Sequence, residues 1–203
     1  MNKYINLCLI IFAFIFLEWA CHDCNLVSEQ LLTDLQKSQN PFKGFEIITF
    51  NSGDSIVEFT GTGRYNTVKE YDISTSYCNW GVIEYNDLTF VGEDHRLYLD
   101  MVGPYVFNIS LYELSTDFDV LTTFDIDKTT GELSNYEELI DSLTINNSLY
   151  FKIYKNPMVD VSHPNDIPDS AKRAIYLYYS TDFGVVKIDF SDSTSWDLKN
   201  IEW

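Results

Sequence analysis

The chain has 203 residues, a formal net charge of −18 at pH 7 and a hydrophobic content of 45%. Such a negative surface repels phosphate backbones and anionic headgroups, so nucleic acid is not an expected partner. The hydrophobic content is too high for a disordered acidic tail, and the length suits one domain with its own core. The composition therefore predicts a single folded, acidic domain.

An apolar run lies close to the first residue. It spans residues 4–17, follows Lys3 and ends before Glu18. The run is shorter than the roughly 20 apolar residues that a membrane helix needs. A basic start followed by a short apolar core is typical of a secretory signal. Residues 1–20 are therefore predicted to be a signal peptide.

Ala20 directly precedes Cys21 at the end of this run. The pair resembles the lipobox of bacterial lipoproteins, although Glu18 stands where a typical lipobox has leucine. The resemblance implies that Cys21 receives acyl chains and that residues 21–25 tether the protein to a membrane of the cell envelope. The outer membrane, on its periplasmic or surface side, is the expected location. Plain secretion and an uncleaved anchor are the alternatives.

Two further cysteines, Cys24 and Cys78, are candidates for one disulfide in an oxidising envelope. Such a bridge closes a long loop and would add about 4 kcal/mol in the entropic model. Two free thiols are the alternative, because the sequence does not give the distance between them. The sequence "CHDC" at 21–24 is followed by no second ligand pair of the kind that structural zinc needs. No metal and no cofactor are therefore expected.

Residues 26–203 are expected to form one β-rich domain. The segment 27–38 predicts a short helix, because Ser28 can cap it and its leucines line one face. The segment 44–63 predicts a hairpin, with Gly53 supplying a positive φ in the turn. Further strands are expected at 66–73, 79–85, 87–91, 96–101 and 105–114. In the last of these, one face is formed by Tyr105, Phe107, Ile109 and Leu111.

The second half of the chain also predicts strands. Polar breaks between them are frequent, which favours antiparallel connections. The expected elements are a strand, turn and return at 121–134, a helical turn at 135–141, strands at 142–146 and 149–155, a loop at 156–170 and strands at 173–180, 183–190 and 194–199. The predicted fold is mainly β, with a curved antiparallel sheet or sandwich, a half-barrel being one form, and one short N-terminal helix.

The stretch "AIYLYYSTDFGVVKIDFSDSTSWDL" at 174–198 is similar to the last strands of small envelope lipoproteins of the Bacteroidota type. These end in an aromatic strand, a glycine turn and a hairpin. The resemblance covers the signal and these C-terminal residues, implies a β-rich lipoprotein domain and carries over no catalytic residue. Some exported lipoproteins with curved sheets are half-barrels that hold a lipid or acyl chain. A carrier of an apolar ligand is therefore one alternative function.

Two polar clusters in the sequence resemble ligand or proton-transfer sites. Asp125, Asp127 and Thr129 alternate as calcium ligands do, but the glycine and glutamate spacing of an EF-hand loop is missing, which favours a structural turn. His163 lies among aspartates in the long loop and His95 in a polar turn, and both are interpreted as solvated.

No nucleophile motif of a known hydrolase type is present in the sequence. No catalytic residue is therefore assigned, and the protein is not expected to be an enzyme. A secreted hydrolase of unrecognised type is kept as an alternative.

Four tyrosines are candidate ligand contacts. Tyr150 and Tyr154 share a face of one predicted strand, and Tyr176 and Tyr178 share a face of another. If the two strands are neighbours, this stripe would suit a glycan, peptide or protein ligand, whereas packing in the core is the alternative. We therefore expect a non-enzymatic binding or interaction module, attached to the membrane through acyl chains on Cys21.

Overall fold

The fold was analysed in a computed structural model that describes residues 25–73, 79–115, 118–161 and 172–203. Within these residues, regular structure consists of strands and one short helix. In chain order the elements are β1 (Asn25–Gln30), α2 (Asp34–Lys37), β2 (Ile47–Ser52), β3 (Ser55–Asp72), β4 (Asn79–Val91), β5 (His95–Val102), β6 (Val106–Glu113), β7 (Phe118–Ile126), β8 (Leu133–Ser134), β9 (Glu138–Ile145), β10 (Ser148–Pro157), β11 (Val159–Asp160), β12 (Ala174–Ser180), β13 (Gly184–Phe190) and β14 (Ser195–Glu202).

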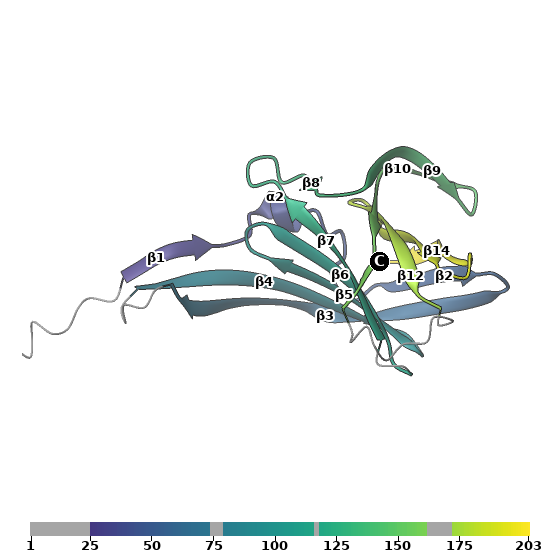
Figure 1. Ribbon diagram of the computed structural model, residues 1–203, viewed down its shortest axis with the longest axis horizontal. Helices are drawn as coiled ribbons and strands as arrows, with labels where there is room; N and C mark the ends of the chain where they lie inside the picture. Colours follow the sequence, from purple (N-terminus) through teal and green to yellow (C-terminus); the bar gives the residue numbers. More distant parts are fainter. Residues whose placement is uncertain (1–24, 74–78, 116–117, 162–171) are drawn as a thin grey trace, which may run out of the picture.

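All of the described strands belong to one 14-stranded sheet. Its order is β11-β7-β6-β5-β4-β3-β2-β14-β13-β12-β10-β9, with β1 beside β4 and β8 beside β7. The pairs are antiparallel except for β1 with β4. The sheet curls into an open half-barrel (Figure 1). The predicted mainly β, curved antiparallel fold with one short helix is therefore confirmed, in its half-barrel form.

The inner face of the sheet is apolar because strands such as β5 and β6 alternate between buried and partly exposed positions. Leu97, Leu99 and Met101 point inward from β5, and Phe107, Ile109 and Leu111 point inward from β6. The alternation predicted for 105–114 is confirmed for these three residues of β6. Tyr105 lies just before the strand and is exposed.

The segment between α2 and β2 crosses the inner face and joins its two sides. Phe42 is fully buried there and packs edge-to-face on Phe90 of β4, with 5.0 Å between ring centroids. On the other side it lies against Gly184 of β13, where a Cβ atom would approach the Phe42 ring to 2.2 Å. The Tyr179 hydroxyl donates to the Gln39 carbonyl at 2.7 Å. This segment therefore holds the β4 side and the β13 side of the curl together.

Aromatic side chains fill the interior where β10 and β12 face β6 and β7. Phe107 and Tyr179 pack edge-to-face at 5.2 Å, and Phe124 lies 5.9 Å from Tyr179 and 6.3 Å from Tyr154. All four rings are at most 1% exposed. Aromatic pairs of this geometry add stability beyond the burial of their surface. The interior of the half-barrel is thus a packed core at this point.

The helix predicted over 27–38 is wrong in its first half. Asn25–Gln30 forms β1, and α2 covers only Asp34–Lys37. Thr33, not Ser28, caps the helix: its Oγ1 accepts from Gln36 N at 3.2 Å, and Gln36 Oε1 accepts from Thr33 N at 2.9 Å. Pairing with the edge of β4 determines the conformation of β1, and such tertiary pairing overrides local propensity.

Three boundaries differ from the prediction in other parts of the chain. β3 runs through residues 61–63 as one strand, because a register shift between Gly61 and Arg64 absorbs the irregularity as a β-bulge. β4 is likewise one strand across 79–91. The helical turn predicted at 135–141 is absent from the described structure, where β9 begins at Glu138.

Candidate functional site

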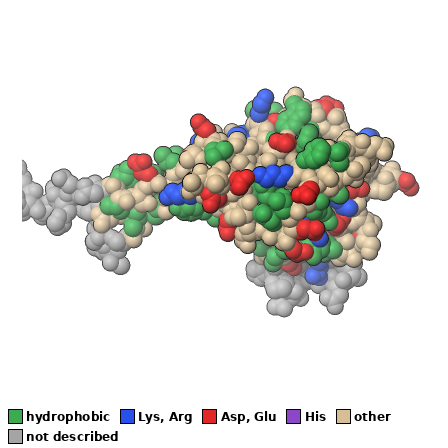
Figure 2. Space-filling view, turned by 90° about the horizontal axis from the view of Figure 1, so that it is seen from above, with side chains coloured by type: hydrophobic (Ala, Val, Ile, Leu, Met, Phe, Trp, Pro, Cys, Tyr) green, Lys and Arg blue, Asp and Glu red, His purple; other side chains and the backbone are tan. Residues whose placement is uncertain are grey.

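A three-stranded arm projects from the half-barrel. We define the arm as β1, residues 64–72 of β3 and residues 79–87 of β4, with β4 in the middle. Figure 1 shows it extending away from the body, and Figure 2 shows a narrow extension with hydrophobic side chains at its surface. Residues 65–70 of β3 are exposed at every position, on both faces of the sheet. The arm is therefore the part of the described fold most open to a partner.

Tyr71 holds the three strands of the arm together. Its ring passes over Gly81 of β4, where a Cβ atom would approach the ring to 2.8 Å. Its hydroxyl accepts from Gln30 Nε2 at 2.8 Å and donates to Ser28 Oγ at 3.3 Å, both on β1. Glycine at position 81 is required here because any side chain would displace the ring. The contact links β3 to β1 across β4.

Buried polar groups fix the base of the arm to the body. Glu84 of β4 is buried, accepts from Leu32 N at 3.0 Å and pairs with Lys37 Nζ of α2 at 2.7 Å. Asn86 Nδ2 donates to Asn66 Oδ1 across the β3–β4 pair. The charge of Glu84 is thus compensated, as a buried carboxylate requires. These bonds orient the arm relative to α2.

One edge of the arm has no partner strand among the described residues. On this side β2 pairs with β3 only as far as Thr60. Beyond Thr60, two more backbone N–H groups of β3 have hydrogen-bond partners: Gly61 N donates to Glu46 O at 2.9 Å, and Gly63 N donates to Gly44 O at 2.7 Å. From residue 64 to 72 no described segment lies in hydrogen-bonded register with this edge. We call this stretch the β3 edge.

The β3 edge is long, is not interrupted by proline and carries no net charge. Natural edges are blocked by charge, by proline or by being short. The stretch 64–72 contains no proline, and its two basic and two acidic residues cancel in a chain of net charge −18. Tyr65 and Val68 are 61% and 58% exposed. An edge of this kind suits strand addition, in which a second strand pairs with its backbone groups.

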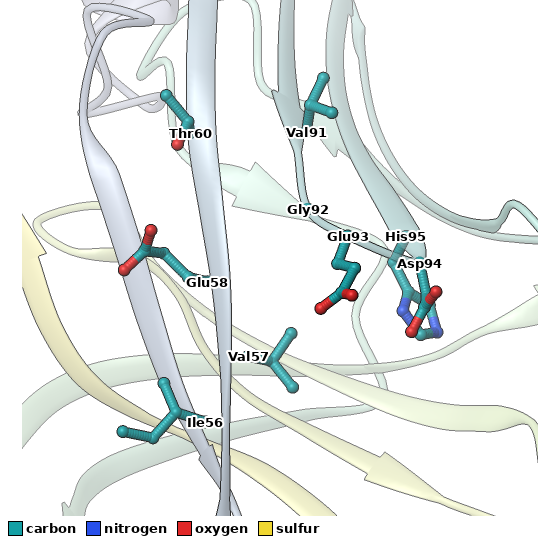
Figure 3. Close-up of a pocket in the computed structure, with 9 residues that line it drawn as sticks. All are labelled: Ile56, Val57, Glu58, Thr60, Val91, Gly92, Glu93, Asp94 and His95. Atoms are coloured by element: carbon teal, nitrogen blue, oxygen red, sulfur yellow. The ribbon is translucent and has the colours of Figure 1, made fainter.

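A polar hollow of about 380 Å³ lies at the other end of β3 (Figure 3). Glu58 lines it from β3, Glu93 and Asp94 line it from the β4–β5 turn, and His95 lines it from the start of β5. Burial lowers the pKa of His95, while the charges of Glu113 and Asp94 act in the opposite direction. The His95 ring packs edge-to-face on Trp196 at 4.8 Å. Since this histidine is a packing residue at an open rim, we assign no chemistry to the hollow.

Two carboxyl groups meet on the outer face of the sheet. Asp87 of β4 and Asp100 of β5 are directly opposed in register, and Asn108 Nδ2 donates to Asp100 Oδ2 at 3.4 Å. Burial, and then the hydrogen bond and charge of Asp87, raise the pKa of Asp100 to about 7. A carboxyl group that keeps its proton near neutral pH avoids the repulsion of two charges in contact. The pair carries no arrangement of a nucleophile or metal ligand set.

The expected tyrosine stripe does not form as predicted. Tyr150 and Tyr154 are buried, with 7% and 1% exposure, and belong to the core. Lys152 has a φ of 52°, which interrupts the alternation of β10 so that Ile153 and Tyr154 are both buried although they are neighbours. For these two tyrosines the burial therefore favours packing in the core, the alternative that the sequence left open, over contact with a ligand.

Tyr176 and Tyr178 are half-buried on the outer face of β12. Lys155 Nζ lies 4.4 Å from the centre of the Tyr176 ring. The Tyr178 hydroxyl donates to Asp189 Oδ2 at 2.8 Å, and Lys187 pairs with the same aspartate at 3.1 Å. Burial, followed by this hydrogen bond, raises the pKa of Tyr178. Both rings are already engaged by neighbouring strands, and their role as ligand contacts stays a prediction.

Several candidate residues lie outside the described part of the chain. They are Cys21, Cys24, Cys78 and His163, together with the segment 1–24 that holds the expected signal and most of the 21–25 tether. In the part of the chain that the structure describes, no helix has the length and apolar character to cross a membrane. The same residues contain no group of histidine, cysteine and carboxylate side chains placed to hold a metal ion.

The arm was missed at the level of sequence, although a signal for it was present. A strand packed on a core shows one apolar and one polar face, whereas 64–72 reads "RYNTVKEYD" and places polar residues on both faces. That pattern indicates a strand with no buried face. What the pattern does not give is the register that leaves one edge unpaired.

The chain was compared with known proteins. No protein-family profile, curated protein or solved structure matched it.

Proposed function

We propose that the protein is a lipid-anchored lipoprotein of the bacterial cell envelope that acts as a non-enzymatic interaction module, with the arm as its interaction surface. The observation that carries the proposal is the β3 edge, a row of backbone groups without a described partner strand. Exposed backbone groups of this kind hydrogen-bond to water in the isolated protein and to a partner strand when one adds. The exposed Tyr65 and Val68 side chains add apolar contact surface.

The position of the arm in the chain fits attachment at Cys21. β1 is one of the three strands of the arm and begins at Asn25, the last residue of the expected tether. Acyl chains on Cys21 would therefore attach the protein to the membrane close to the start of β1, and so close to the arm. Two-chain or stronger lipidation is the kind of attachment that gives stable membrane binding.

Replacement of Cys21 by serine tests the anchor. Cys21→Ser removes the acylated atom, so the protein is expected to move from the membrane fraction to the soluble fraction of the envelope. Cys24→Ser is the matched control and should stay with the membrane. Sedimentation of the Cys21→Ser protein with membranes after a high-salt wash would contradict attachment at this residue.

A photoreactive side chain placed on the β3 edge tests the interaction surface. A photoreactive phenylalanine analogue at Val68, in the full exported chain, is expected to give covalent protein adducts in intact envelopes. Ile175 is the control position: it is also apolar and 39% exposed, but its strand β12 is paired with β10 and β13. Adducts of equal yield at both positions, or none at Val68, would contradict the proposal.

A carrier of an apolar ligand would need an apolar cavity inside the half-barrel. In the described interior, that space is filled by the rings of Phe107, Phe124, Tyr154 and Tyr179 and by the segment that carries Phe42. The hollows at Glu58 and at Asn51 are polar and lie at strand ends. We therefore do not put the carrier forward as a second candidate.

A further inference from the structure

We infer that the occupant of the β3 edge is a second copy of this chain, paired antiparallel through residues 64–72 about a two-fold axis at Val68. The inference rests on the proposed function of the arm and names its partner. Closed two-fold symmetry is the commonest arrangement of identical chains, and it requires a surface that complements itself. A two-fold pairing of the β3 edge therefore requires complementary backbone groups, side chains and charge.

The backbone directions decide which residues can pair. Ile73 N donates to Asn79 O at 3.1 Å, so the backbone groups of residue 73 point toward β4. In an antiparallel strand these directions alternate. The N–H and C=O groups of the even residues after the bulge, which include Asn66, Val68 and Glu70, therefore point away from β4 and toward the free edge. Only registers that oppose even residues with even residues can form.

The register with Val68 on the axis brings complementary side chains together. Val68 then faces Val68 of the second copy, and each Asn66 faces Glu70 of the other copy. Asn66 Oδ1 already accepts from Asn86, which leaves its Nδ2 group as the donor that the Glu70 carboxylate needs. On the opposite face of the sheet, Tyr65 lies across from Tyr71. Aromatic and β-branched cross-strand pairs of this type stabilise sheets.

Neighbouring registers of the same parity are worse. An axis at Lys69 would place two lysines directly opposite each other, and an axis at Glu70 would oppose two carboxylates. Like charges in direct cross-strand positions are destabilising. An axis at Thr67 would oppose Val68 with Asn66 and Glu70 with Arg64, whose Nη2 already donates to Asn40 O at 3.1 Å. The Val68 register is thus the one that leaves no charge or apolar residue mismatched.

Charge also distinguishes a second copy from other partners. The chain as a whole carries −18, so two copies repel each other over most of their surface, but 64–72 is neutral. The exposed edge of β9 offers a contrast, because 138–145 contains Glu138 and Asp141 and no basic residue. A basic peptide would be drawn to acidic edges such as β9. A neutral, self-complementary edge is instead suited to its own copy.

The shape of the molecule leaves room for this pairing. The arm extends from one end of the body, so antiparallel overlap of two arms places the two bodies at opposite ends (Figure 1). The six strands would form one continuous sheet in the order β1-β4-β3-β3-β4-β1. The paired edges would then be internal, and the two β1 strands would lie at the outer borders with both Cys21 tethers adjacent to them.

Cysteine cross-linking in the full exported chain tests the axis. In the proposed register two Val68→Cys side chains face each other within disulfide range, whereas two Lys69→Cys side chains are offset along the strands beyond about 7 Å between Cα atoms. Oxidised envelopes should give a reducible product of twice the monomer mass for Val68→Cys, in several-fold excess over Lys69→Cys and over the unmodified chain. Equal yields for the two variants would overturn the proposed axis.

A proline variant keeps the test independent of cysteine chemistry. The Val68 N–H points to the free edge, so Val68→Pro leaves the β3–β4 bonds intact and removes one intermolecular donor. The variant is expected to sediment as a monomer in detergent where the unmodified chain sediments as a dimer, while its folded β-sheet content stays unchanged. A monomeric unmodified chain would overturn the inference.

The photochemical experiment at Val68 separates the two proposals. An adduct of twice the chain mass supports both. An adduct with a different protein overturns the second copy as occupant and leaves the arm as an interaction surface. If no adduct forms, the proposed function fails as well.

Discussion

At the scale of single residues, the raised pKa of Asp100 makes the stability of the protein depend on pH. Its pKa of about 7 in the folded protein lies above the ordinary value of 3.8. Between these two values the folded state therefore binds more protons than the unfolded state. By linkage, the free energy of unfolding falls as the pH rises from about 4 to about 7. Over this range Asp100 loses its proton more readily in the unfolded chain, because in the folded protein its carboxylate would lie against Asp87.

Asp100→Asn should remove this dependence. The amide has the shape of the protonated carboxyl group and can donate to Asp87 at any pH. The variant is expected to be more stable than the unmodified protein at pH 8, with the difference vanishing near pH 4. Urea unfolding at both pH values measures it, and Asp72→Asn, an exposed aspartate at the end of β3, is the control. A constant difference between pH 4 and pH 8 would contradict the raised pKa.

At the scale of elements, the arm behaves as a small sheet whose strands are joined by one ring. Tyr71 reaches from β3 across Gly81 to two side chains of β1. β1 has no comparable anchor among the described strands of the body, since it pairs with β4 alone. The attachment of β1 thus depends on glycine at position 81 of β4, where a side chain would displace the Tyr71 ring.

Gly81→Ala should therefore loosen β1. The new methyl group would overlap the Tyr71 ring, and overpacking of this kind typically costs about 1–3 kcal/mol. Hydrogen exchange of the amides in 25–30 should become faster while the body strands stay protected. Tyr71→Phe keeps the ring and loses only its hydrogen bonds, for which about 1 kcal/mol is expected. Unchanged exchange of 25–30 in Gly81→Ala would contradict the role of the ring.

At the scale of the whole molecule, the sequence predicts most of the strands but not how they pair. The strands in 79–114 were predicted because their alternation of buried and exposed residues follows the packing of a sheet on a core. β1 was mistaken for a helix because leucines three and four apart also occur at a strand followed by a helical turn. Its true conformation depends on the edge of β4, which lies far away in the sequence.

The candidate site shows the same limit. The tyrosine stripe assumed an unbroken period of two, and the positive φ at Lys152 interrupts that period so that the neighbours Ile153 and Tyr154 are both buried. Whether an edge is free depends on where β2 stops pairing, and that is set by the bulge near Gly61 and by the segment that carries Gly44. Neither feature leaves a local pattern that a period of two or 3.6 can detect.

The sheet order places β2 between β3 and β14, so that Asn51 pairs in register with Asp197, although the two residues lie far apart in the sequence. The β2–β14 pair joins the strands β2 to β7 to the meander β12–β14. It can form only after nearly the whole chain is available. Non-local pairing of this type slows folding, because the entropy of a long loop is lost before the contacts form. A chain delivered residue by residue, as during its synthesis, would expose the unpaired edge of β2 to other strands until β14 arrives. The half-barrel is therefore expected to depend on chaperone binding during delivery more than a protein built from sequential hairpins would.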